Sequence, residues 1–188
     1  MEHIRPSYAL GDTIAAVATP PGDGGVAIIR VSGKEAFTVV EKLFSGPVSS
    51  YTSHTAHYGR IHNLQGDYLD DVLVLVFQGR RSFTGENTVE IQCHGGRFIT
   101  RRILEATLSA GARAALPGEF TFRAFVHGKI DLAQAEAVQE LIAAKNAHAL
   151  DAAENQLQGA LSQKIGLFQS QLLDIAAVLE AWVDFPEE

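Results

Sequence analysis

The sequence predicts an α+β protein: a mixed domain of strands and helices over residues 1–130, followed over residues 131–188 by the first long helices of an all-α domain. Two observations lead to this prediction. The spacing of apolar residues changes near residue 131 from short strand-like runs to a helical repeat. The charge changes at the same place, because residues 1–130 hold 13 Lys and Arg against 12 Asp and Glu, whereas residues 131–188 hold 2 against 10. Together these breaks favour two structural units.

The elements of the first domain are predicted from alternation, β-branched runs and turn residues. Strands are expected over 13–19, 26–32, 57–62, 71–77 and 88–94, and helices over 34–44 and 96–109. The segment 45–55 is rich in Ser, Thr, Gly and Pro, which is typical of a loop. The second helix is expected to stop at Ala110-Gly111, since glycine commonly follows a helix end.

The second unit is predicted from helical spacing. Asp131 is a good N-cap with Gln134 three positions later, a variant of the capping box, and a helix is expected over 132–150. A continuous apolar stripe from Leu157 to Trp182 predicts a further helix, roughly 39 Å long at 1.5 Å per residue, which Pro186 should end. One helical partner cannot bury such a stripe, so further helices are expected in additional sequence or in another chain.

The composition argues against a disordered, membrane-spanning or secreted protein. The chain is 46% hydrophobic and 20% charged, which is typical of a folded protein and not of a disordered one. No apolar run approaches the ~18–20 residues that span a bilayer, and the N-terminus lacks the layout of a secretory signal. A single cysteine, Cys93, excludes an internal disulfide. We therefore expect a cytoplasmic protein with no membrane contact.

Three charged residues are candidates for a binding site. Arg30 lies in a strand with apolar residues on both faces, so it is either half of a structural ion pair or an anion contact at the strand end. Alternation places Glu90 on one strand face with Gln92 and His94. That face is either solvated or a ligand-facing wall, in which a carboxylate could accept two hydrogen bonds from an amino-heterocycle. Lys129 follows Gly128 at the domain boundary and is either a surface lysine or a contact to a bound anion.

Little in the sequence supports a phosphate loop, a metal site or a catalytic centre. The turn PPGDGG at 20–25 is not a phosphate loop, because G-x-x-x-x-G-K-[ST] occurs nowhere in the chain. The spacing of the histidines and Cys93 argues against a metal site, and no nucleophile elbow or plausible triad is present, so no catalytic residue is expected. Phe122 and Phe125, three positions apart, are expected to pack into a core.

Three long segments occur in order: DTIAAVATPPGDGGVAIIRVSG at 12–33, FTGENTVEIQCHGG at 83–96 and ARAALPGEFTFRAFVHGKIDLAQAEAV at 112–138. Together they resemble the MnmE (TrmE) family of tRNA-modification GTPases. Asn87 stands where the family usually has Asp, and His127 where it usually has Asn. The segment LQGALSQKI at 157–165 and the terminal DFPEE also fit, so the resemblance covers residues 12–188.

The resemblance implies a fold and a function. The first domain should resemble the tetrahydrofolate-binding domain of the glycine-cleavage aminomethyltransferase, form a homodimer, and bind 5-formyl-tetrahydrofolate near the dimer interface through Arg30, Glu90 and Lys129. Family members also carry a GTPase domain, which uses GTP, Mg²⁺ and K⁺, and a C-terminal cysteine motif. With the FAD- and NADH-using partner MnmG they modify the wobble uridine of certain tRNAs. The 188 residues alone are expected neither to hydrolyse GTP nor to modify tRNA.

Two other functions stay open at this point. A stand-alone folate-dependent one-carbon transferase would need an amine pocket and a catalytic carboxylate, and Asp23 is the only acid in the glycine-rich loop. A purely structural assembly module would carry a vestigial pocket. Stoichiometric folate binding distinguishes the folate domain from the assembly module, and turnover with a folate and an amine identifies a transferase.

Overall fold

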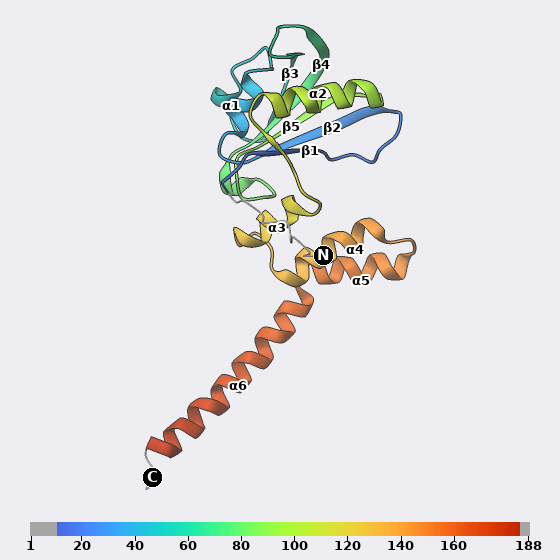
Figure 1. Cartoon of the computed structure of the whole chain (residues 1–188). Coiled ribbons are helices and arrows are strands. Elements are labelled where there is room, and N and C mark those ends of the chain that lie inside the picture. The colour runs from blue at the N-terminus through green and yellow to red at the C-terminus, as the bar shows by residue number, and fades with distance from the viewer. Residues whose placement is uncertain (1–10, 185–188) are drawn as a thin grey trace, which may run out of the picture. The chain divides into compact units, whose positions relative to one another are not determined.

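The chain divides into two units between Lys129 and Ile130 (Figure 1). The structure, a computed structural model, describes residues 11–184. Pro186, which is expected to end the last helix, lies outside the described residues. The mixed α/β unit followed by helices confirms the predicted fold class.

A six-stranded sheet forms the centre of the first unit, with the strand order β3-β4-β5-β2-β1-β6. Its strands are β1 (Ile14–Val17), β2 (Gly24–Ser32), β3 (Thr55–His62), β4 (Tyr68–Phe77), β5 (Thr88–Gly95) and β6 (Arg113–Ala114). Neighbouring strands pair antiparallel except β1 and β6, which run parallel. The five strands predicted from alternation are confirmed. The two-residue strand β6 was not predicted, since two residues carry no measurable period.

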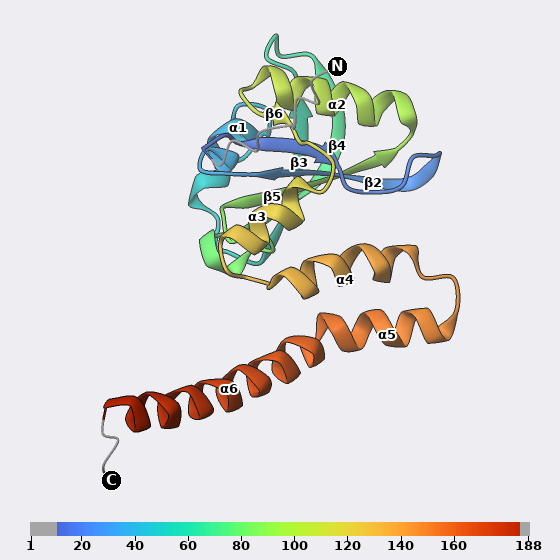
Figure 2. The same cartoon turned by 60° about the horizontal axis from the view of Figure 1, so that its bottom comes forward.

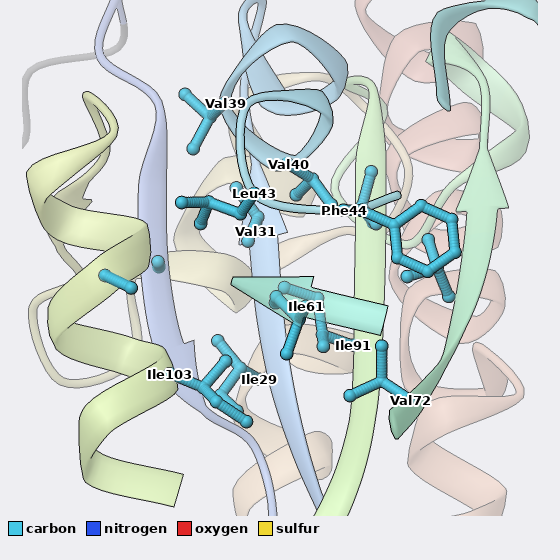
Figure 3. Packing of buried hydrophobic residues seen from close by; sticks show 14 of the residues in the cluster. Ile29, Val31, Val39, Val40, Leu43, Phe44, Ile61, Val72, Ile91 and Ile103 are labelled. Atoms are coloured by element: carbon cyan, nitrogen blue, oxygen red, sulfur yellow. The ribbon is translucent and has the colours of Figure 1, made fainter. Parts of the chain in front are cut away.

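Helices cover the two faces of this sheet unequally. The unit contains α1 (Ala36–Glu41), α2 (Arg97–Ser109), α3 (Glu119–Val126) and the short 3₁₀ turns Val48–Ser50 and Gly79–Arg81. Figure 2 shows α1 and α2 on one side of the sheet and α3 on the other. The main apolar core lies under α1 and α2, where Val40 and Ile103 meet Ile29 and Ile91 of the central strands, all four fully buried (Figure 3).

The interior of α3 differs from the expectation. Phe125 is 38% exposed, and the fully buried residues of this helix are Glu119, Arg123 and Ala124. Aromatic side chains were expected inside on their apolar area alone. Two charged side chains lie there instead because each has opposite charges within reach, which compensates for the loss of hydration.

The second unit contains three helices, α4 (Leu132–Ala143), α5 (Ala147–Leu157) and α6 (Ala160–Asp184). The capping box at the start of α4 is confirmed: the Asp131 side chain accepts from the Gln134 N–H, and the Gln134 side chain accepts from the Asp131 N–H. The single helix predicted over 132–150 is wrong. The backbone turns to extended geometry at Ala144, and Asn146 caps a new helix by accepting from the Ala149 N–H.

The predicted long helix is confirmed as α6, which is 25 residues long. It begins after Gly159, whose φ of +85° favours glycine. Leu157, the first residue of the predicted apolar stripe, therefore ends α5 and does not belong to α6. The apolar side chains of α6 are exposed, with Phe168 63% and Trp182 71% accessible. Among the described residues, no helix is both long and apolar enough to cross a membrane.

Candidate functional site

The candidate site lies on the sheet face opposite α1 and α2, along the junction of β2 and β5. Four residue pairs follow one another there. Beginning at the end beside α3, they are Ser32–Thr88, Arg30–Glu90, Ile28–Gln92 and Val26–His94. The first pair is buried, whereas Val26 is 59% exposed. Arg30 and Glu90 thus lie where the sheet face passes from covered to open.

Arg30 and Glu90 form a direct ion pair. Nη2 of Arg30 lies 2.7 Å from Oε1 of Glu90, and Nε donates to the same oxygen at 2.8 Å. Their side chains are 28% and 16% exposed, so the pair is shielded but reachable. Within the described residues, neither Nη1 of Arg30 nor Oε2 of Glu90 makes a hydrogen bond. The pair therefore offers a free donor beside a free acceptor, which suits a planar ligand with both kinds of group on one edge.

Two phenylalanines flank the guanidinium of Arg30. Its Cζ lies 5.8 Å from the ring centroid of Phe83 and 5.6 Å from that of Phe120, both within cation–π range. Phe83 belongs to the segment between β4 and β5, and Phe120 is in the first turn of α3. Two segments far apart in sequence therefore fix the direction in which Arg30 points.

A buried charged cluster joins those two segments. Nη1 of Arg123 donates to both carboxylate oxygens of Glu86, at 3.0 and 3.2 Å, and Nη2 donates to Oε1 of Glu119 at 3.1 Å. Arg113 donates to Glu119 from the other side, at 2.7 and 3.1 Å. Burial alone would raise the pKa of Glu119. Hydrogen bonds from Arg113, the Leu116 N–H and Arg123 outweigh burial and lower that pKa, so Glu119 is held as a carboxylate.

Polar contacts extend the cluster to the sheet. Ser32 Oγ donates to Oε2 of Glu86 at 3.2 Å and lies 2.7 Å from Oγ1 of Thr84. Nη1 of Arg123 also donates to the carbonyl oxygen of Asp12, just before β1, at 2.7 Å. The segment that carries Phe83 is thereby tied both to β2 and to α3.

Lys129 follows α3 and contacts the segment that carries Phe83, and no described contact joins it to Arg30 or Glu90. Its Nζ donates to the carbonyl oxygen of Arg80 at 2.6 Å. Next to it, Nδ1 of His127 lies 2.8 Å from the carbonyl oxygen of Thr84. Gly85, at φ +80°, fits beneath both side chains, since a Cβ there would lie 3.0 Å from the His127 Cβ and 3.3 Å from the Lys129 Cγ.

An open hollow of about 430 Å³ continues the same sheet face beyond Arg30 and Glu90. Gln92 and His94, the next outward residues of β5, line it together with Tyr58 and Leu73. His94 is fixed by Asp70, whose carboxylate accepts from its backbone N–H at 2.8 Å and lies 2.7 Å from its ring Nδ1. The polar face of β5 that alternation predicted therefore borders a space large enough for part of a ligand.

Sequence reasoning singled out Arg30, Glu90 and Lys129 separately. The structure pairs the first two and places the third against the segment that carries Phe83, where its Nζ contacts Arg80. It also adds residues that sequence reasoning missed: Phe83, Phe120, Glu86, Glu119 and Arg123. One signal could have found part of this set, since Glu119 and Arg123 stand at i and i+4 in a segment otherwise rich in aromatic residues.

Known proteins match both units of the chain. The family model described as GTP-binding protein TrmE N-terminus matches residues 13–129, and the model of the MnmE helical domain matches residues 132–188. The tRNA modification GTPase MnmE of Protochlamydia amoebophila (strain UWE25) is 68% identical over 188 residues, which cover the whole chain and 41% of that protein. The protein of the same name from Chlamydia felis (strain Fe/C-56) is 55% identical over 177 residues, or 94% of the chain and 40% of the relative.

Proposed function

Because this chain belongs to the MnmE family of tRNA modification GTPases and corresponds to its N-terminal portion, we propose that it is the part that binds a reduced folate and forms a dimer. The chain spans about 40% of the length of the relatives it matches. G-x-x-x-x-G-K-[ST] does not occur in its sequence. We therefore assign GTP hydrolysis to the whole protein and not to these 188 residues.

The Arg30–Glu90 pair is the observation that carries the folate proposal. The free Oε2 of Glu90 suits the amino group of a pterin, because an ionised carboxylate oxygen accepts a strong hydrogen bond from such an N–H. The free Nη1 of Arg30 suits a carbonyl or carboxylate oxygen. Phe83 and Phe120 keep the guanidinium partly out of water, which strengthens its contact with an anionic group.

The surroundings of the pair give such a ligand room and further charge. The hollow beyond Gln92 can hold the body of a folate that extends along the sheet face. Lys129, exposed and in contact with the segment that carries Phe83, supplies a cation for a carboxylate of the ligand. We assign 5-formyl-tetrahydrofolate as the folate, and a second copy of the chain as the dimer partner.

The proposal for the whole protein follows the names of the relatives. We propose that it acts on tRNA, modifying the wobble uridine together with the FAD-dependent partner MnmG. The contribution of this chain would be to hold the one-carbon carrier and to bring two copies together.

Calorimetric titration with 5-formyl-tetrahydrofolate tests the proposal, with the mass in solution measured on the same sample. One folate per chain and a dimeric mass are expected. A folded dimer that binds no folate would support the assembly module. Steady conversion of a folate and an amine by the chain alone would support the transferase instead.

A further inference from the structure

The buried cluster of Glu86, Glu119 and Arg123 connects to all three predicted site residues, although it contains none of them. Arg123 and Glu119 are 0% exposed, and the Glu86 side chain is 13% exposed. We propose that this cluster is the positioning device of the site. It fixes the segment 80–87 against α3 and thereby sets the directions of Arg30 and Lys129. The inference deepens the proposed folate site and rests on it.

The two rings that flank Arg30 come from Phe83 and Phe120, on either side of the contact between Glu86 and Arg123. Glu86 is three residues after Phe83, and Arg123 is three residues after Phe120. If the contacts of 3.0 and 3.2 Å between Arg123 and Glu86 were lost, neither ring would be held at its present distance from the guanidinium. The Glu86–Arg123 ion pair, at 3.0 Å, is a direct charge contact between the two segments.

Lys129 is also held by the segment 80–87. Its Nζ donates to the Arg80 carbonyl oxygen, and His127 lies close to the Thr84 carbonyl oxygen further along this segment. The Lys129 backbone N–H donates to the Ala124 carbonyl oxygen of α3, so a shift of the segment relative to α3 would break the contact that directs Nζ. One cluster thus sets the directions of both cations of the site, Arg30 and Lys129.

Burying Arg123 with two carboxylates carries a large desolvation penalty, and apolar residues of similar size often give a protein equal or greater stability. Phe83 and Phe120 stand close by, so the surroundings could accommodate an apolar interior. A charged cluster at this place is better explained by orientation, because charge-assisted hydrogen bonds, such as those from Arg123 Nη1 to both oxygens of Glu86, are directional and apolar packing is not.

The test compares Glu86→Ala with Glu86→Gln in the full chain. Binding of 5-formyl-tetrahydrofolate is measured by calorimetry, and the Arg30 Nε–H resonance by NMR, since ring currents from Phe83 and Phe120 make it sensitive to their positions. Glu86→Ala should move the resonance and raise the Kd roughly 10- to 100-fold, as expected for a misplacement of about 1 Å. Glu86→Gln, which can still accept from Arg123, should keep both the Kd and the Arg30 resonance close to their wild-type values.

Arg113→Lys is the matched control. It perturbs the same Glu119 carboxylate from the side away from the segment 80–87. It should lower the unfolding temperature while leaving the Kd and the Arg30 resonance unchanged. If Glu86→Ala does not fold, Ser32→Ala removes the hydrogen bond from β2 to Glu86 and should produce a smaller shift in the same direction.

The outcomes separate this inference from the proposed function. A wild-type chain that binds no folate overturns the folate proposal, and the Arg30 resonance still decides whether the cluster positions that side chain. A folded Glu86→Ala chain with an unchanged Arg30 resonance overturns the positioning role. So does an effect of equal size in Arg113→Lys, since that would mean the cluster contributes only to stability.

Discussion

Arg30 and Glu90 stand opposite each other on β2 and β5, with Nη2 of the arginine 2.7 Å from Oε1 of the glutamate. Both contacts of Arg30 go to that one oxygen, and both side chains keep some exposure to solvent. An ion pair of this kind contributes little net stability, because partial desolvation offsets its attraction. The pair can, however, replace one of its internal contacts with a contact to a ligand at a small cost in free energy. For this reason we centre the candidate site on it.

Replacement of Glu90 by Gln should weaken folate binding without unfolding the chain. The amide keeps the size of the side chain but loses the charge and the ability to accept on both arms. A hydrogen bond to a charged group is worth about 1.5–3 kcal/mol, which corresponds to roughly a 10- to 150-fold rise in Kd. Glu105→Gln, which alters the exposed pair of Arg101 and Glu105 on α2, should leave the Kd unchanged. Equal affinity of Glu90→Gln and wild type would argue against Glu90 as a ligand.

The first unit should lose stability in acid because of Glu119. Its pKa is lowered in the folded state, so the carboxylate contributes stability that is fully present above its unfolded pKa of about 4.3. That contribution is lost as the pH falls below this value and through the lowered folded pKa. Denaturant unfolding measured between pH 3 and pH 7 should show the decline.

The same group can be tested by substitution. Glu119→Gln removes the charge that Arg113 and Arg123 share, which should cost about 3–5 kcal/mol at neutral pH. The variant should also show a flatter dependence on pH below about 4.3. An unchanged acid slope in Glu119→Gln would mean that other carboxylates set the pH dependence.

Two adjacent glycines should respond differently to a methyl group. At Gly95 a Cβ would lie 2.7 Å from the carbonyl carbon of Gly24, and that backbone belongs to the paired strand. Gly95→Ala should therefore destabilise the chain by about 1–3 kcal/mol, as overpacking does. At Gly96 the nearest atom would be 3.6 Å away, an ordinary contact. Thermal unfolding of Gly96→Ala should match wild type, and similar losses in both variants would contradict the described pairing.

The capping box of the second unit should be measurable in the same way. Asp131→Ala removes a side chain that accepts from the Gln134 N–H and from Ser162, and these contacts lower the pKa of Asp131. The loss should be about 1 kcal/mol, typical of an N-cap. Asp174→Ala, at an exposed position within α6, replaces the same residue type where no cap is formed. If the two variants unfolded alike in circular dichroism, Asp131 would not act as a cap.

The sequence was informative where one period governs an element. Alternation predicted β2 and β5, and helical spacing predicted α2 and α6, because each buries one face on one layer. The break within 132–150 was missed because the apolar positions continue at helical spacing across Ala144, while the turn depends on the capping of Asn146.

The site was only partly predictable for a different reason. Arg30 and Glu90 could each be singled out as charges in apolar strands, but their contact depends on a strand register across 60 positions of sequence. The contact of Glu86 with Arg123 spans 37 positions. No local pattern encodes such distances, so the charged interior of α3 could only be found in the folded chain.

The most direct test of the central claim is to map 5-formyl-tetrahydrofolate onto the chain by NMR. We predict saturable shifts of the Arg30 Nε–H and of the backbone amides of Glu90 and Gln92, with the amides of α2 as an internal reference. Shifts confined to α2 or to the second unit, or none at all at saturating folate, would contradict the assignment of the Arg30–Glu90 pair as the folate site.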